Sequence, residues 1–138
     1  MESLEADLLK ICRGKSYEHN YQVVTELDHI FKKKGERYVT ENMEKVLSKL
    51  QPFSKSAKEL NTYAYVLLRA KATETSKAMT VFKMNTKLFP KDKNCYDSLA
   101  EAYFVTKNYE KATENYNKVL ELDPTDKNAK AMLAKMKG

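Results

Sequence analysis

The chain of 138 residues is long enough for one domain with a modest core and too short for two domains of usual size. With 42% hydrophobic and 32% charged residues, and only three Gly and three Pro, its composition favours helices. No apolar run approaches the roughly 20 residues that cross a bilayer, and the acidic start is not that of a signal peptide. The compartment stays open: we expect a cytoplasmic protein if the sequence is full-length, and an extracytoplasmic one if it is a piece of a secreted protein.

The N-terminal part predicts three amphipathic helices, over residues 2–12, 17–34 and 37–50, from apolar residues that recur every three or four positions. The second of these ends in three lysines followed by Gly35. Cations suit the negative end of a helix, and glycine can take the C-cap conformation, so this run is interpreted as a helix end. The third helix is closed by Pro52.

The rest of the chain continues the same helical periodicity. Further stripes run through residues 60–68 and 78–88, and two more helices are separated at Lys107-Asn108, where Asn108 is the expected N-cap. A last helix covers residues 129–136. No strand-like alternation occurs, and the short linkers predict antiparallel neighbours.

Two segments of the chain repeat each other. The prolines that end them, Pro90 and Pro124, are 34 residues apart, as are Ala78 and Ala112. This period and pattern resemble the tetratricopeptide repeat, a unit of two helices that stacks into a solenoid. In residues 93–126 its signature positions hold Tyr96, Leu99, Ala100, Tyr103, Ala112, Tyr116 and Pro124. The resemblance implies an all-α fold, a right-handed α-solenoid of antiparallel helix pairs with about eight helices.

Small residues at these positions let the two helices of a unit approach closely, and tyrosines fill the space beside them. The preceding unit carries Ala64, Ala78, Phe82 and Pro90, with two extra residues interpreted as an insertion within RAKATETSKA. We therefore expect a single helical domain over 1–138, made of degenerate N-terminal helices (1–52), a repeat-like unit with a two-residue insertion (57–90), a regular unit (93–126) and a capping helix (127–138).

A narrower resemblance covers residues 57–138. The stretches ELNTYAYVLL, VFKMNTKLFP and CYDSLAEAYFVTKNYEKATENYNKVLELDP are similar to the repeat region at the C-terminus of some secreted serine hydrolases of β-lactamase or esterase type, with the look of Bacteroidetes proteins. The resemblance implies an alternative function, that of an accessory domain whose catalytic domain is absent from this chain.

Motifs for catalysis are missing from the sequence. No Ser is followed by Lys three residues later, and glycines at positions 14, 35 and 138 alone cannot form a GxSxG turn. His19 and His29 are too far apart to share a metal, and Cys12 and Cys95 form neither a metal motif nor a disulfide framework. We therefore expect no enzyme activity, no cofactor and no metal site.

Binding of a protein or peptide is the function that the fold favours, because the first helix of each repeat lines a concave surface. Chaperone-binding members clamp a C-terminal carboxylate with Lys and Asn, whereas Asp97 and Glu101 here would repel one. Neither the partner's identity nor the oligomeric state is indicated. The predicted lining positions are Asn61, Tyr65, Leu68, Asn94, Asp97, Glu101, Phe104, Val105, Asn128 and Lys135.

A second alternative is a nucleic-acid binder. The net charge is +6, and most of the excess lies in the middle of the chain, at Lys58, Arg69, Lys71, Lys77, Lys83, Lys87 and Lys91. These residues lack interleaved Gly and exposed aromatic platforms, so a solvated helix face is the preferred interpretation.

Overall fold

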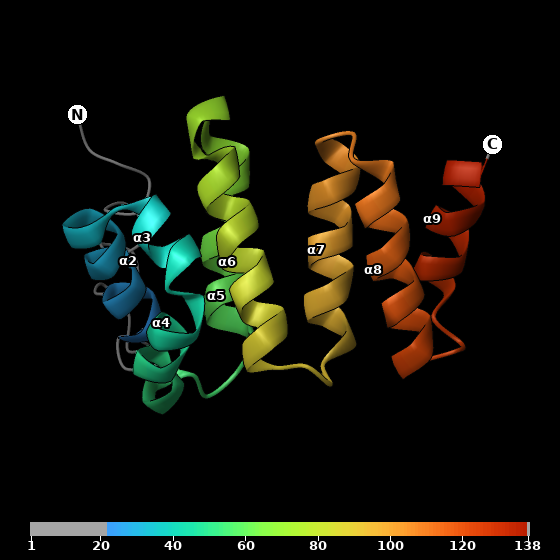
Figure 1. Ribbon diagram of the computed structural model, residues 1–138. Coiled ribbons are helices and arrows are strands. Elements are labelled where there is room, and N and C mark those ends of the chain that lie inside the picture. The colour runs from blue at the N-terminus through green and yellow to red at the C-terminus, as the bar shows by residue number, and fades with distance from the viewer. Residues whose placement is uncertain (1–21, 138) are drawn as a thin grey trace. The chain divides into compact units, whose positions relative to one another are not determined.

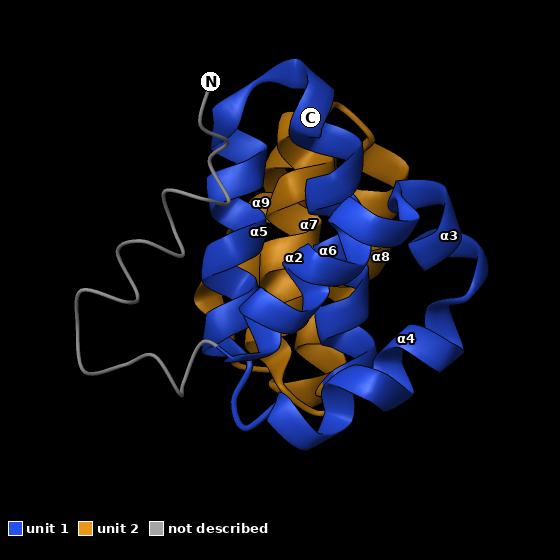
Figure 2. Ribbon diagram, turned by 90° about the vertical axis from the view of Figure 1, so that its left-hand side faces the viewer, with its two compact units in different colours: residues 1–88 blue, residues 89–138 orange. Residues whose placement is uncertain are grey.

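The structure is a computed structural model that describes residues 22–137 (Figure 1). This part of the chain forms eight α-helices, α2 to α9, with two 3₁₀ turns and no strand, which confirms the predicted all-α, helical-repeat fold. The helix predicted at 2–12, together with Cys12 and His19, lies outside the described residues. The contacts divide the chain into two compact units, residues 1–88 and 89–138 (Figure 2).

Unit 1 begins with α2 (Gln22–Lys34), whose last turn holds three lysines. Gly35 follows with φ 91° and ψ 163°, a positive-φ conformation that glycine adopts without steric cost, and its N–H donates to the Phe31 carbonyl at 2.9 Å. The helix end at Gly35 is therefore as predicted, although its ψ is not that of a left-handed helical residue.

The helix predicted over 37–50 is broken in two. It consists of α3 (Glu36–Glu41) and α4 (Met43–Leu50), separated at Asn42. The Asn42 backbone N–H and side-chain amide both donate to the Tyr38 carbonyl, at 2.9 and 3.0 Å, with φ −117° and ψ 35°. An asparagine side chain competes in this way with helix continuation, so the prediction of one continuous helix was wrong.

A 3₁₀ turn, η2 (Gln51–Phe53), leads to the hairpin of α5 (Lys58–Ala70) and α6 (Thr75–Leu88), with η3 (Ala72–Glu74) between them. Ala64 and Ala78, the small residues of the pattern, are fully buried, and Phe82 is 1% exposed. Close approach of α5 and α6 accounts for the need for small side chains.

Unit 2 contains α7 (Lys93–Val105), α8 (Tyr109–Leu122) and α9 (Lys127–Lys137). Its core cluster comprises Ala100, Ala112, Tyr116, Val119 and Ala129, all fully buried or nearly so. Half-buried side chains of all three helices pack around this cluster. Unit 2 is thus a hairpin of α7 and α8 with α9 packed against it, and α7 and α9 hold the candidate site beside this core.

The turn between α7 and α8 fixes the end of α7. Lys107 has φ 66°, its N–H donates to the Phe104 carbonyl at 3.0 Å, and the Asn108 N–H donates to the Tyr103 carbonyl at 2.8 Å. These two bonds form a Schellman motif, in which a left-handed residue closes the helix. Asn108 then caps α8 by accepting from the Lys111 N–H at 3.3 Å, which confirms the predicted N-cap.

Candidate functional site

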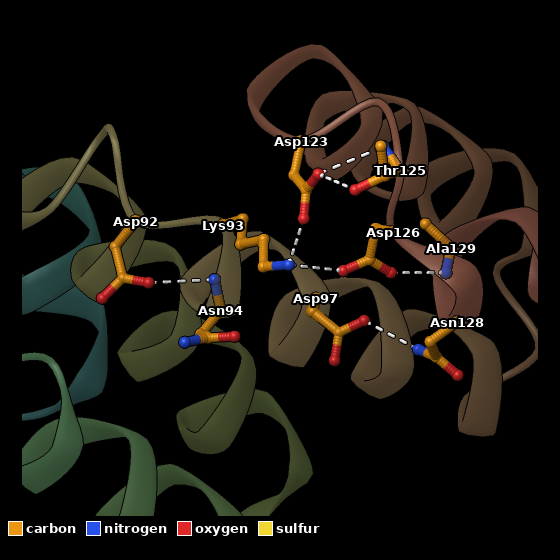
Figure 3. A network of polar contacts seen from close by, with 9 residues as sticks. All are labelled: Asp92, Lys93, Asn94, Asp97, Asp123, Thr125, Asp126, Asn128 and Ala129. Carbon is orange, nitrogen blue, oxygen red and sulfur yellow. Dashed lines mark hydrogen bonds and ion pairs between the residues drawn. The ribbon is translucent and has the colours of Figure 1, made fainter.

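The candidate surface in unit 2 is formed by α7, the first helix of the hairpin, and by α9, which follows the hairpin. Two contacts show that they share a face. The Asn128 side-chain amide donates to Asp97 Oδ1 at 2.9 Å (Figure 3), and Lys135 Nζ lies 5.4 Å from the centre of the Phe104 ring. The structure therefore brings four of the predicted lining residues together in two cross-helix pairs.

The end of this surface near the start of α7 is acidic. Asp97 is half-buried, and burial raises the pKa of its carboxyl, while the hydrogen bond from Asn128 acts in the opposite direction. Glu101 is exposed one turn further along α7. Burial also raises the pKa of Tyr116 to about 12, and the negative charges of Asp97 and Glu101 add to the effect. Two carboxylates, those of Asp97 and Glu101, therefore lie one turn apart on this part of α7.

The other end is apolar. The Phe104 ring is half-buried and packs edge-on against Tyr109, with ring centres 5.5 Å apart. Beside it lies a pocket of about 250 Å³ lined by Phe104, Tyr109, Lys135 and Met136. Val105 and Tyr109 are 55% and 48% exposed. Of the remaining predicted positions in unit 2, Asn94 is exposed at the start of α7.

Three further predicted positions, Asn61, Tyr65 and Leu68, lie on α5 in unit 1, and all are partly buried. The Tyr65 ring packs edge-on against Phe82, with ring centres 5.0 Å apart. The guanidinium of Arg69 covers the same ring at 4.9 Å. Asn61 Oδ1 is buried and has no hydrogen-bond partner among the described residues. The Tyr65 ring thus packs within its own hairpin of α5 and α6. The periodicity alone did not indicate this packing role.

A polar clamp holds α9 against α7, and the sequence analysis did not anticipate it (Figure 3). Lys93 Nζ pairs with Asp123 and, at 2.9 Å, with Asp126. Asp126 also caps α9 by accepting from the Ala129 N–H at 2.9 Å. The signal was present in the two aspartates of the Asp-Pro-Thr-Asp linker, since such residues commonly cap helices and bend turns.

The pKa values in the clamp reflect this pairing. Hydrogen bonds from Lys93 and from Thr125 lower the pKa of Asp123 to about 2. The two carboxylates raise the pKa of Lys93 above its ordinary value, with the hydrogen bond to Asp123 as the largest cause. Lys93 therefore stays charged, and the clamp positions Asn128 where it can reach Asp97.

The described part of the chain offers no cluster of metal ligands and no reactive thiol. Residues 22–137 contain no cluster of three or more His, Cys, Asp or Glu that could hold a metal ion. Cys95 is a buried free thiol, and burial raises its pKa to about 12, so it is a poor nucleophile at neutral pH. None of the helices in this range is both long and apolar enough to cross a membrane.

Comparison with known proteins agrees with the fold of unit 2. The family described as tetratricopeptide repeat matches residues 98–126, which cover most of α7, all of α8 and the linker to α9. No curated protein matches the chain significantly. The resemblance of residues 57–138 to the C-terminal regions of serine hydrolases stays a hypothesis. The family match and the helix pairs together support a tetratricopeptide-type helical-repeat fold for this chain, the fold of modules that bind other proteins.

Proposed function

We propose that the face of unit 2 formed by α7 and α9 binds an extended peptide segment that carries basic residues and one apolar anchor. The observation that carries the proposal is the acidic pair Asp97 and Glu101, one turn apart on α7 and followed on the same face by the apolar pocket at Phe104. Opposite charge guides association and sets specificity, while a buried aromatic contact supplies much of the affinity.

The spacing on α7 predicts the spacing in the ligand. Asp97 and Phe104 are seven residues apart, which is about 10 Å along a helix. An extended peptide covers this distance in about three residues. The preferred segment should therefore place its basic residues about three positions from its apolar anchor. Lys135 covers part of the Phe104 ring, so basic residues next to the anchor should be disfavoured.

A randomised peptide library tests this proposal. Wild-type protein should enrich sequences with the stated spacing, and the selected peptide should then be titrated by calorimetry against variants. Glu101→Lys should weaken binding because it reverses an exposed charge on the face. Phe104→Ala should lower affinity by about 2 kcal/mol or more, as for an aromatic hot spot.

The control is Glu114→Lys, which makes the same change of charge at an exposed position on α8. Asp97 is less suited to the test because it is half-buried and bonded to Asn128, so its replacement also disturbs the contact between α7 and α9. The proposal fails if Glu101→Lys and Glu114→Lys bind the selected peptide as tightly as the wild type does.

No catalytic step is part of this proposal. The interaction module is expected to turn over neither ester nor β-lactam reporter substrates. The alternative role, as an accessory domain of a serine hydrolase, can be tested in the source genome. It requires coding sequence for an SxxK or GxSxG domain in frame before Met1.

A further inference from the structure

A second surface lies in unit 1 and shares no residue with the surface described above. It is a pocket of about 230 Å³ between α2 and the pair α3 and α4. Ile30 and Tyr38, both partly exposed, give it an apolar wall, and the buried side chains of Val46 and Leu50 close it from below. An apolar cavity of about 150 Å³ accommodates benzene, so this pocket has room for one leucine or phenylalanine side chain.

Three lysines of the pocket rim have no partner among residues 22–137. Lys33 on α2 and Lys45 and Lys49 on α4 are exposed and line the pocket, and none makes an ion pair or hydrogen bond with any of residues 22–137. In contrast, the neighbouring Lys32 is paired with Asp28 at 3.0 Å. Unpaired cations around one concave site raise the local concentration of anions.

The remaining lining residues do not cancel this charge. Lys34 is a fourth lysine, and its Nζ lies 5.5 Å from the centre of the Tyr38 ring. Among the described residues, Glu26 is the single acidic one that lines the pocket. Four lysines therefore face one carboxylate, and the site carries a positive charge that an incoming ligand must balance.

The positions of the apolar and charged groups in the pocket indicate which kind of ligand fits it. Apolar groups lie inside the pocket and cations lie at its rim, so a ligand that enters must place an apolar group inward and anions outward. A phosphorylated side chain would enter with its charge first and would meet apolar groups. An aliphatic or aromatic side chain flanked by carboxylates matches both parts of the site.

We propose that this basic pocket, defined by the rim lysines Lys33, Lys45 and Lys49 and the wall residue Ile30, docks an acidic segment of a partner protein. The segment inserts one leucine or phenylalanine and places flanking Asp or Glu side chains on the rim. The chain thereby has two protein-binding surfaces of opposite charge preference, a basic one on unit 1 and an acidic one on unit 2.

The experiment uses the full chain and a fluorescein-labelled peptide of about a dozen residues, with a central leucine flanked by Asp and Glu. Binding is followed by anisotropy at about 50 mM and about 300 mM salt, since screening weakens such contacts. Lys45→Gln combined with Lys49→Gln should weaken binding about three- to tenfold. A peptide with serine in place of the leucine should also bind more weakly.

The matched control is Lys55→Gln combined with Lys58→Gln, which removes the same charge from exposed positions of unit 1 that do not line the pocket. The control should bind like the wild type, and amide shifts in the NMR spectrum should cluster at His29, Ile30 and Lys49. Equal losses in both double variants would overturn the proposal, because net charge alone would then explain binding. So would absence of peptide binding at low salt, or binding of vesicles of phosphatidylglycerol in preference to the peptide.

Discussion

Ala100 shows how one side chain sets the distance between two helices. It is fully buried in the unit 2 core together with Ala112. Ala100→Leu should overpack this contact and lower the free energy of unfolding by about 1–3 kcal/mol, measured by thermal or urea unfolding. Ala131→Leu, at an exposed position of α9, should change it by less than about 0.5 kcal/mol. Unfolding of Ala100→Leu that matches the wild type would refute the close contact.

Lys107 is a residue in a conformation that its side chain disfavours. Its φ of 66° lies in the left-handed region, which costs a non-glycine residue about 1–2 kcal/mol. Lys107→Gly should therefore stabilise the protein by about 0.5–1 kcal/mol after the added entropy of the unfolded chain is subtracted. Lys130→Gly, within α9, should instead destabilise by about 1 kcal/mol. A lower melting temperature for Lys107→Gly would argue against the Schellman motif.

We expect the attachment of α9 to α7 to depend on pH. The folded pKa of Asp123 is about 2, below the ordinary value of about 3.9 that applies in the unfolded chain. Its stabilising contribution is therefore present above about pH 4 and is lost as pH falls towards 2. Lys93, whose pKa is raised, contributes below about pH 10.4 and loses its contribution above that value.

Lys93→Met should make stability less dependent on pH between 4 and 2, because Asp123 then loses the partner that lowers its pKa most. Urea unfolding at several pH values measures this effect. Lys91→Met, at an exposed neighbouring position, should keep the wild-type dependence. The clamp would be excluded as the cause if both variants followed the wild-type curve.

At the scale of helices, the sequence predicted most of the fold because apolar periodicity and end signals agree. Asn108 and Gly35 mark helix ends through local hydrogen bonds, and such signals can be read from neighbouring residues alone. The break at Asn42 was missed because asparagine is compatible with an exposed helix position. Which carbonyl its amide bonds to is decided by the folded chain.

The candidate site was predictable only in part. The repeat register placed Asp97 and Asn128 on one lining surface, but the hydrogen bond between them was not predicted. In contrast, the basic pocket joins Lys33 with Lys45 and Lys49 across the break at Asn42. In the sequence, Lys33 is explained as part of a helix end, and no role was predicted for Lys45 and Lys49. Their convergence requires the packing of α4 on α2.

At the scale of the whole molecule, the positive charge is unevenly distributed. Residues 22–88 hold 13 Lys and Arg and 7 Asp and Glu, so their net charge is 13 − 7 = +6. The net charge of the entire chain is also +6. Self-repulsion of this kind lowers stability and is screened by salt. Raising salt from about 10 to about 200 mM should therefore raise the melting temperature.

Lys45 and Lys49 contribute to this repulsion because like charges four residues apart on a helix repel by about 0.2–0.5 kcal/mol. Lys49→Gln should stabilise the protein by that amount at low salt and should make its melting temperature less dependent on salt. Lys55→Gln, outside the helices, should have a smaller effect. If Lys49→Gln instead destabilised the protein, Lys49 would stabilise the fold. This outcome would contradict its role as a binding residue.

The two extra residues of the α5–α6 hairpin are shared between helix and linker. Ala64 lies six positions before the last residue of α5, and Ala100 lies five positions before the last residue of α7. The linker that follows has four residues after α5 and three residues after α7. Each pair of alanines is nevertheless fully buried. In evolutionary terms, a change in the length of a hairpin tip is close to neutral as long as the paired small residues still pack together. A sequence profile that expects a fixed spacing between the two alanines would not align with both helices of such a unit. Homologous repeats with longer hairpin tips would therefore be under-counted in genomes.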